Sequence, residues 1–491
     1  MTLSDVQRGV EALGISGEPR ALAILQALQA GDLVVGPGGA VLIRDGAALR
    51  DAATGEPSPD APTRPVRVNN NVRRAAQAAL GALRLFAPDP AARAVAAESL
   101  FRARDPADSP ALDRAIAAEQ NPVVRRAMLQ ARAALTLAAP PSDAAVLTAI
   151  GILRDRGGPE ARSIIVATPN PSPAVVAAIE GATASIDLQQ KLIGAGQMLF
   201  YGLSLGSVLL LAAAGLAISF GVMGVINMAH GELLMLGAYT TFVVQEIIRA
   251  RAPWLFEVSL LIAIPAAFLV AGGAGVVIER TMLRYLYGRP LETLLATWGL
   301  SLVLQQAVRS IFGADNRNVG TPAWMSGTID VAGMALTINR LTIIAFSVTV
   351  LVALVVGLRT TSLGLQMRAV TQNRRMAAAM GIRTPWVDAL TFGLGSGLAG
   401  IAGVALSQID NVSPNLGQGY IIDSFMVVVF GGVGNLWGTA LAAIVLGVVN
   451  KIMEPLAGAV LGKVVVLVLL VLFIQRKPRG MFPLKGRAVE A

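Results

Sequence analysis

The sequence contains no cysteine and only one histidine among its 491 residues. Disulfide bonds and thiolate metal sites are therefore excluded, and so is a metal site that needs several histidines from this chain. Charged residues are scarce as well, at 14% of the chain, whereas a soluble protein carries about a quarter. Hydrophobic residues instead make up 54%, and 51 residues are glycine. This composition favours a protein with a large membrane part.

The net charge of +9 lies entirely in the second part of the chain. Residues 1–190 contain 19 arginines, no lysine and 19 acidic residues, so this part is neutral. Residues 191–491 contain 21 basic and 12 acidic residues. The basic residues stand between apolar runs rather than among aromatic residues on a polar face, which is typical of membrane proteins. We therefore expect contact with membrane lipid and no nucleic-acid partner.

Residues 1–190 are predicted to form a soluble helical extension. Four segments with apolar residues at three- and four-residue spacing are separated by proline-containing breaks, at 72–86, 90–103, 122–137 and 143–155. A V-R-R-A element recurs at 72–75 and 124–127, which suggests HEAT-like helical pairs that hide their apolar faces by stacking. Between Asp32 and Asp45, apolar residues around a glycine-rich centre predict a short hairpin. We interpret this extension as a docking or spacer domain, with small-ligand binding as the alternative.

Residues 191–491 are predicted to form a polytopic bundle of membrane helices. A crossing helix needs about 20 mainly apolar residues. Candidate segments occur at 198–220, 228–247, 256–278, 293–312, 341–357, 387–407, 421–433, 437–452 and 457–474. The seventh and eighth are short and are interrupted by Gly431-Gly432-Val433-Gly434, which suggests broken or re-entrant helices. The predicted fold class is all-α: a HEAT-like extension followed by a bundle of eight or nine passes.

Arginine and lysine residues predict the orientation of this bundle. Thirteen of them gather in the loops 279–290 and 358–386 and in the C-terminal tail. Such residues favour the cytoplasmic side. An odd number of passes then places the C-terminus in the cytoplasm and residues 1–190 in the periplasm. Residues 1–10 lack the basic start and apolar core of a signal peptide.

The segment Ile226–Glu232 (INMAHGE) places polar residues between two apolar runs. A charge at the centre of a membrane helix costs about 2.5–3.5 kcal/mol on insertion. A broken helix here would direct Asn227, His230 and Glu232 at a translocated solute. In the alternative interpretation, His230 and Glu232 cap the next helix or pair with each other. Further along the chain, Gln305 and Gln306 are candidates for the same path, although interhelical hydrogen bonds explain them equally well.

The loop 358–386 is too polar to cross a membrane and contains a short predicted helix that ends at Gly381. A helix lying across the cytoplasmic face would let a separate motor protein move the bundle. The candidate residues for docking such a motor are Arg374, Arg375, Met376, Ala379, Met380 and Gly381. In the alternative interpretation, the loop is solvated and its basic residues only determine how the neighbouring helices are oriented in the membrane.

Two further motifs imitate catalytic or nucleotide-binding signatures. Gly202–Gly206 (GLSLG) matches the G-x-S-x-G pattern, but it lies within an apolar helix, where small residues favour helix packing. Gly458–Lys463 (GAVLGK) is one residue short of a phosphate loop and is followed by valine. We therefore assign no catalytic and no metal-binding residue to the chain.

Several segments resemble branched-chain amino acid ABC permeases, and they occur in the order typical of that family. They are 215–239 (GLAISFGVMGVINMAHGELLMLGAY), 368–382 (RAVTQNRRMAAAMGI), 389–406 (ALTFGLGSGLAGIAGVAL) and 431–447 (GGVGNLWGTALAAIVLG). The long N-terminal extension and the segment 226–235 (INMAHGELLM) resemble the urea-transporting members of this family. The resemblance implies a second permease subunit, two cytoplasmic ATPase subunits and a periplasmic solute-binding protein. It also implies that 372–383 is the coupling helix and that ATP is bound by partner chains, with no cofactor in this one.

The functional hypothesis is urea import across the bacterial inner membrane by alternating access, driven by ATP on separate subunits. A branched-chain amino acid or short-amide permease is the alternative within the same class. A passive urea channel and an intramembrane hydrolase built on Ser204 and His230 are alternatives from other classes. Transport without the ATPase subunits would indicate the channel, and hydrolytic activity dependent on Ser204 would indicate the enzyme.

Overall fold

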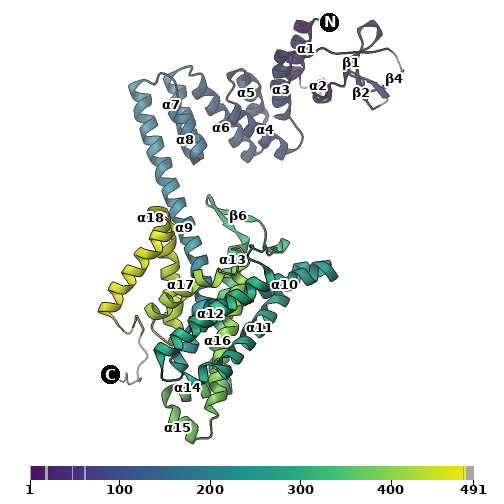
Figure 1. Cartoon of the computed structure of the whole chain (residues 1–491). Helices are drawn as coiled ribbons and strands as arrows, with labels where there is room; N and C mark the ends of the chain where they lie inside the picture. Colours follow the sequence, from purple (N-terminus) through teal and green to yellow (C-terminus); the bar gives the residue numbers. More distant parts are fainter. Residues whose placement is uncertain (1, 17–19, 47, 60–61, 479, 483–491) are drawn as a thin grey trace. The chain divides into compact units, whose positions relative to one another are not determined.

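The computed structural model describes residues 2–16, 20–46, 48–59, 62–478 and 480–482. It divides into two compact units, Met1–Leu192 and Ile193–Ala491 (Figure 1). Each unit is described separately below.

The first part of unit 1 combines three helices with a small antiparallel sheet. The helices are α1 (Leu3–Ser16), α2 (Ala21–Ala30) and α3 (Asn70–Arg84). The sheet has the strand order β4 (Pro57–Ser58), β3 (Ala48–Asp51), β2 (Val41–Asp45), β1 (Leu33–Val35) and β5 (Arg64–Pro65). β1 and β2 pair with Val34 opposite Leu42, so the predicted hairpin between Asp32 and Asp45 is confirmed. The all-α prediction is wrong for this region, because five short strands form a sheet there.

A helical array follows. Its helices are α4 (Pro90–Ala103), α5 (Ser109–Ala118), α6 (Pro122–Ala138), α7 (Asp143–Arg156) and α8 (Gly158–Val166), with the short η2 (Pro106–Asp108) before α5. Proline stands in the first turn of α4 and α6, and the preceding Asp89 and Asn121 side chains accept hydrogen bonds from backbone N–H groups of that turn. The four helices predicted in residues 1–190 are confirmed as α3, α4, α6 and α7. Taken with its sheet, however, the unit is not clearly HEAT-like.

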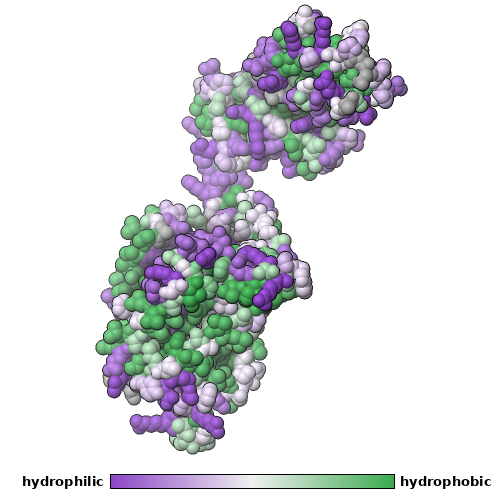
Figure 2. Space-filling model, turned by 45° about the vertical axis from the view of Figure 1, so that its right-hand side comes forward, coloured by the Kyte–Doolittle hydropathy of each residue, from purple (hydrophilic) through white to green (hydrophobic). Residues whose placement is uncertain are grey.

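The helices of unit 2 form the membrane bundle. They are α9 (Pro173–Met223, which begins in unit 1), α10 (His230–Arg251), α11 (Ser259–Thr281), α12 (Pro290–Phe312), α13 (Ile338–Thr360), α14 (Ser362–Gln372), α15 (Arg374–Ala379), α16 (Thr384–Leu406), α17 (Leu416–Gly431) and α18 (Leu436–Arg476). Short elements are η3 (Pro253–Val258), η4 (Leu283–Tyr285), η5 (Ala323–Met325) and the hairpin β6 (Thr328–Val331) and β7 (Met334–Thr337). Hydrophobic side chains cover much of the visible face of this unit, and hydrophilic ones gather towards its two ends (Figure 2).

Six helices in the described part of the chain are long and apolar enough to cross a membrane. They are α9, α10, the segment Pro253–Tyr285 around α11, α13, α16 and the first part of α18 to Gly458. Six of the nine predicted passes are therefore supported, and the predicted segments 293–312, 421–433 and 457–474 are not among these six helices. All nine predicted apolar segments are helical, but α17 has only 16 residues and α18 is broken at Gly458, where φ is 81°. The predicted interruption between Gly431 and Gly434 is present, because α17 ends at Gly431 and α18 begins at Leu436.

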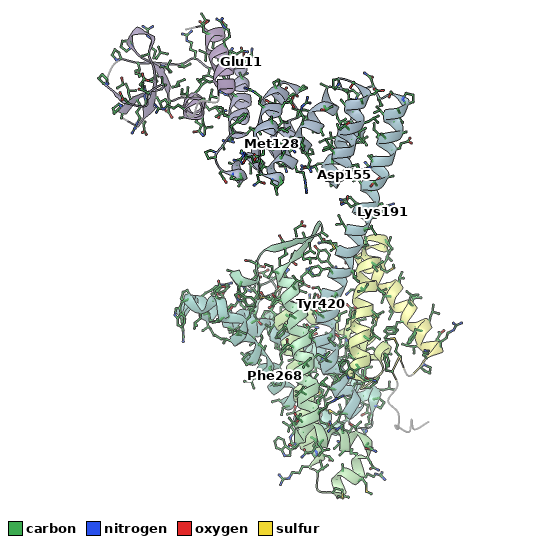
Figure 3. The ribbon with its side chains drawn as sticks, turned by 180° about the vertical axis from the view of Figure 1, so that it is seen from behind. Glu11, Met128, Asp155, Lys191, Phe268 and Tyr420 are labelled. Atoms are coloured by element: carbon green, nitrogen blue, oxygen red, sulfur yellow. The ribbon has the colours of Figure 1, made fainter. Side chains whose placement is uncertain are left out.

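Helix α16 lies at the centre of the bundle, where it packs against α10 and α11. Glycines allow these backbones to approach one another closely. A Cβ atom added at Gly237 of α10 would collide with the backbone of Gly400 on α16, and one added at Gly397 would lie 2.6 Å from the Phe268 ring of α11 (Figure 3). Packing through small residues is a common basis of helix association in membranes.

Candidate functional site

The chain leaves helical geometry between α9 and α10, at residues 224–229. Gly224 has φ 67°, a left-handed conformation that glycine adopts without steric cost. Asn227 is buried, and its Oδ1 accepts a hydrogen bond from the Ala229 N–H at 3.0 Å. The Met228 N–H donates to Thr297 Oγ1 of α12 at 3.1 Å. The predicted helix break is therefore confirmed, and α12 holds it in place.

Glu232 lies in the first turn of α10, directly after this break, and is 1% exposed. Its Oε1 accepts hydrogen bonds from Ser301 Oγ at 3.0 Å and from Gln305 Nε2 at 2.7 Å. Gln418 of α17 donates from its Nε2 to Gln305 Oε1 at 3.3 Å. We call Glu232, Ser301, Gln305 and Gln418 the polar cluster. It joins α10, α12 and α17 within the apolar bundle.

One oxygen of the polar cluster, Glu232 Oε2, is buried without a hydrogen-bond partner in the described residues. A buried carboxylate oxygen left without a donor is unfavourable, and such a group calls for an explanation. A donor supplied by a bound solute would satisfy it. Glu279 Oε2 and Asp388 Oδ1 are also buried without a partner in the described residues, but Glu232 alone of these three lies next to the helix break at 224–229. The open oxygen and the helix break together make the polar cluster the strongest candidate site in the bundle.

His230 does not pair with Glu232, contrary to one of the alternatives. Its Nε2 lies 2.9 Å from the carbonyl oxygen of Ala212, and its side chain is buried against α9. Because that oxygen can only accept, the geometry places the proton on Nε2. His230 thus ties the start of α10 to α9, beside the polar cluster rather than within it.

Gln306 lies outside the polar cluster. Its side chain is exposed and its Nε2 lies 3.4 Å from Ser310 Oγ of the same helix. Ser301 and Gln418, in contrast, belong to the cluster and were not among the predicted residues. Ser301 precedes Gln305 by four positions and so shares its helix face, a spacing that is visible in the sequence. Nothing local to α17 indicates that Gln418 would meet α12.

The loop 358–386 contains the predicted short helix as α15. The Asn373 Oδ1 accepts a hydrogen bond from the Met376 N–H at 3.0 Å, and Gly381 follows the helix with φ 86°. Met376 and Met380 are 63% and 81% exposed. Exposed apolar side chains on a short helix are typical of a surface that another protein covers. Of the other candidate docking residues, Arg375, Ala379 and Gly381 are exposed.

Arg374 differs from its neighbours, because its guanidinium is engaged within the chain. It forms an ion pair and a hydrogen bond with Asp388 Oδ2 at the start of α16. Asp388 is fully buried. The Arg374 side chain is 41% exposed, but its guanidinium is held against α16, so it is less available to a partner than the side chains of Met376 and Met380.

The two motifs that match a catalytic and a nucleotide-binding pattern, Gly202–Gly206 and Gly458–Lys463, have structural roles. Gly202 and Gly206 of α9 face the backbone of α18, where a Cβ at Gly206 would lie 2.8 Å from the Ala443 carbonyl oxygen. Lys463 lies on a helix rather than a loop, and its Nζ pairs with Asp423 Oδ2 at 2.9 Å. In the described ranges, no group of three or more histidine or acidic side chains is placed to hold a metal ion.

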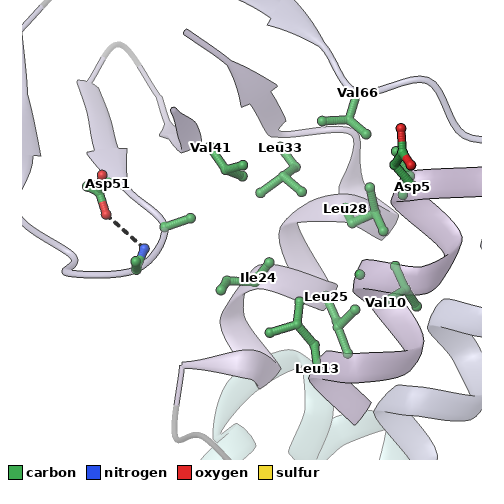
Figure 4. A pocket seen from close by; sticks show the side chains of 14 residues that line it. Asp5, Val10, Leu13, Ile24, Leu25, Leu28, Leu33, Val41, Asp51 and Val66 are labelled. Carbon is green, nitrogen blue, oxygen red and sulfur yellow. Dashed lines mark hydrogen bonds between the residues drawn. The ribbon is translucent and has the colours of Figure 1, made fainter. Parts of the chain in front are cut away.

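Unit 1 contains a cavity of about 380 Å³ between α1, α2 and the sheet. Its lining is mostly apolar, with Leu25, Leu28 and Leu33 pointing inwards (Figure 4). Asp5 and Asp51 stand on its two sides, but both are satisfied locally: Asp5 by Arg8 at 2.6 Å, and Asp51 by backbone N–H groups. The cavity therefore offers an apolar surface and no free charged group.

Comparisons with known proteins agree with the membrane part of this description. The family model "Branched-chain amino acid transport system / permease component" matches residues 198–474. The high-affinity branched-chain amino acid transport system permease protein LivH of Salmonella typhimurium is 30% identical over 295 residues, covering 58% of this chain and 94% of LivH. The corresponding protein BraD of Pseudomonas aeruginosa is 31% identical over 292 residues, with the same coverage, and LivH of Escherichia coli K12 is 29% identical over 295 residues. No solved structure matches the chain significantly.

Proposed function

The chain belongs to the branched-chain amino acid transport system permease family, and on this basis we propose that it carries a small nitrogen-containing solute, in the first place a branched-chain amino acid, across the bacterial inner membrane. As a permease component it is a multi-pass, non-catalytic translocation subunit, and ATP is hydrolysed on separate ATPase subunits. The solute, the partner chains and the orientation are parts of the proposal.

The observation that carries the proposal is the polar cluster. The free oxygen Glu232 Oε2 lies beside the helix break at 224–229. Discontinuous membrane helices typically form solute sites in transporters. The ammonium group of an amino acid carries three N–H donors and a positive charge, and both suit a buried carboxylate. Buried apolar residues of the same helices, among them Leu233 of α10 and Leu416 of α17, would suit an aliphatic side chain. The names of the relatives, all described as branched-chain amino acid permeases, support the same solute.

Urea is the second candidate, favoured by the neutral partners of Glu232. Ser301, Gln305 and Gln418 supply a hydroxyl and two amides, and their hydrogen bonds within the cluster involve no basic side chain. An amino acid also brings a carboxylate, which needs a cationic or N–H-rich partner, whereas urea needs only neutral donors and acceptors. The segment INMAHGELLM, with its resemblance to urea permeases, supports this candidate.

Uptake by the complete complex in vesicles distinguishes these solutes. The complex would contain this chain, a second permease subunit and two ATPase subunits, and a solute-binding protein would be added outside. We expect labelled leucine to be taken up with ATP and to be displaced by excess leucine but not by urea. Displacement by urea alone would replace the first candidate with the second. Solute flux of equal rate without ATP would contradict an importer and indicate a channel.

The proposed contact with the ATPase subunits is α15 with the exposed side chains Arg375, Met376, Ala379 and Met380 and the terminating Gly381. This assignment requires the loop 358–386 to face the cytoplasm, with the C-terminus on the same side and unit 1 in the periplasm. It therefore also requires α12, whose 23 residues are long enough to cross, to span the membrane in addition to α9, α10, α11 and α13, so that five crossings precede the loop. Labelling of single cysteines in intact cells would test it, since the chain contains no native cysteine. Access to a cysteine at Thr360 from outside the cell would contradict the orientation.

A further inference from the structure

Four side chains meet at one end of the bundle, next to α15. They are Glu279 of α11, Tyr287 between η4 and α12, Arg374 of α15 and Asp388 of α16. Glu279 is 1% exposed and Asp388 is fully buried. We call these residues the anchor cluster. It joins three helices and one connecting segment.

The contacts of the anchor cluster form a continuous chain. Arg374 pairs with Asp388 Oδ2. The Arg374 Cζ also lies 5.1 Å from the centre of the Tyr287 ring, a distance at which a cation is attracted to an aromatic face. Tyr287 in turn donates its hydroxyl proton to Glu279 Oε1 at 2.6 Å. Arg374 thus connects α15 to α16 directly and to α11 through Tyr287.

An ion pair in which the carboxylate is fully buried and the arginine side chain is 41% exposed restricts geometry more than it adds stability. Desolvation offsets most of the attraction between the two charges, yet removal of one partner leaves a buried charge without compensation. Because Asp388 is fully buried, its only ion-pair partner in the described chain, Arg374, must stay where it is while the carboxylate is charged. The pair therefore fixes the position of α15 against α16.

The position of α16 in turn determines the position of α10. Gly400 faces Gly237, and a Cβ at Gly403 would collide with the carbonyl oxygen of Leu234. These backbones are in contact with no side chain between them, so a sideways displacement of α16 must displace α10. Helix α10 carries Glu232 of the polar cluster.

We propose that Arg374 is an internal positioning residue: through Asp388 and Tyr287 it attaches α15 to the ends of α16 and α11, and so passes motor movement to the polar cluster. This inference rests on the proposed function, because it presupposes that α15 meets the ATPase subunits. It differs from the docking prediction for Arg374 in a measurable way. A docking residue determines whether the ATPase subunits bind, whereas a positioning residue determines what their binding achieves.

The experiment uses the complete complex in vesicles with the variants R374Q, R374K, D388N and R374Q/D388N. The matched control is R359Q, since Arg359 is an exposed arginine of the loop 358–386 that lies outside the coupling segment 372–383 and has no ion-pair partner in the described residues. Three quantities are measured: retention of the ATPase subunits, ATP hydrolysis with and without binding protein loaded with leucine or, separately, with urea, and solute uptake per ATP. The double variant removes both charges together and so avoids an unpaired buried carboxylate.

We expect R374Q and the double variant to retain the ATPase subunits and basal hydrolysis, but to lose stimulation by the loaded binding protein and uptake per ATP by at least fivefold. R374K should recover part of the stimulation, because lysine keeps the charge but not the planar fork of arginine. R359Q should behave as the wild type. If R374Q does not fold, the result for R374Q/D388N alone decides between the docking role and the positioning role of Arg374.

Normal stimulation in the double variant would overturn the inference, and so would loss of the ATPase subunits, which would make Arg374 a docking residue. A separate variant, M376S/M380S, distinguishes failure of the proposed function from failure of the positioning role. If the ATPase subunits remain bound to that variant with unchanged affinity, α15 is not the docking helix. If they are lost from it while R374Q remains fully coupled, only the positioning role of Arg374 fails.

Discussion

Gln305 Nε2 lies 2.7 Å from Glu232 Oε1, so an amide of α12 donates a hydrogen bond to a carboxylate of α10 inside the apolar bundle. The other oxygen of this carboxylate has no partner in the described residues. The pair thus combines a fixed side chain with an open acceptor, which is the arrangement that a solute-binding group requires.

The first prediction concerns that acceptor. Glu232→Gln keeps the shape of the side chain but removes its charge. Hydrogen bonds to charged groups contribute about 1.5–3 kcal/mol, so the KM for leucine uptake should rise about 10- to 100-fold. Steady-state uptake by the reconstituted complex measures this value. Gln306→Leu is the control, because Gln306 is exposed on the same helix as Gln305 and should leave KM unchanged. Equal kinetics for wild type and Glu232→Gln would assign Glu232 to helix packing.

The second prediction concerns the exposed methionines of α15. Met376→Ser with Met380→Ser removes two apolar side chains that are 63% and 81% exposed, so the fold of this chain should be unaffected. Burial of such side chains at an interface contributes about 1.5–3 kcal/mol each. We therefore expect the affinity for the ATPase subunits to fall by at least tenfold, measured by titration of labelled ATPase onto the purified permease pair. Leu365→Ser is the control, since Leu365 is 63% exposed on the neighbouring α14.

The third prediction concerns the contact between α10 and α16. Gly237→Ala places a methyl group against the backbone of Gly400, where neither helix can yield without moving. Overpacking of this kind costs about 1–3 kcal/mol, and a lower melting temperature in detergent should report it. At Gly273 of α11 nothing lies within 4 Å of an added Cβ. Gly273→Ala should therefore leave the melting temperature unchanged or raise it, because alanine favours the helix. A similar decrease for both variants would contradict the close contact.

The fourth prediction concerns Asp108 at the start of α5 in unit 1. Burial, and secondarily the nearby carboxylate of Asp105, raises the pKa of Asp108 to about 6. In the unfolded chain the pKa is about 3.9, so ionisation is unfavourable in the folded state only. The stability contributed by the neutral carboxyl group is present below about pH 4 and is lost as the pH rises through 6. Local opening of residues 106–118 should cost about 2 kcal/mol more at pH 4.5 than at pH 7.5.

Hydrogen exchange in the full-length protein, corrected for the intrinsic effect of pH, measures this difference. Asp108→Asn should remove most of the pH dependence in this segment. Helix α7, which lies in the same unit, provides the internal reference. A pH dependence of the same size in Asp108→Asn would locate the titrating group elsewhere.

Elements that depend on local patterns could be predicted from the sequence. The nine apolar segments beyond residue 195 are all helical, the hairpin near Asp32 is present, and the short helix before Gly381 lies where its glycine predicts. The apolar periodicity, the turn glycines and the capping residues each act over a few positions, so they can be recognised directly in the sequence. Of the sheet in unit 1, the sequence predicts β1 and β2 but not β3, β4 and β5, because strands of two to four residues show too short an alternation to recognise.

The candidate site was only partly predictable, for a related physical reason. A polar residue in an apolar run stands out, so Glu232 and Gln305 could be singled out one by one. Their partnership joins positions 73 residues apart, and Gln418 is a further 113 residues beyond Gln305. Such pairings depend on which helices become neighbours. Arg374 illustrates the same point: its sequence neighbours suggest a surface arginine, and only the packing of α16 reveals Asp388 beside it.

The side-chain caps of the helical array in unit 1 have a consequence for biosynthesis. Asp89 and Asn121 define the start of their helices within three residues, and these helices pack against others close to them in sequence, α4 against α6 and α6 against α7. Arrays dominated by such short-range contacts fold fast. Under the proposed orientation, unit 1 must nevertheless pass to the far side of the membrane before or while α9 inserts. The secretion machinery then has to engage unit 1 early, before unit 1 folds and can no longer be translocated.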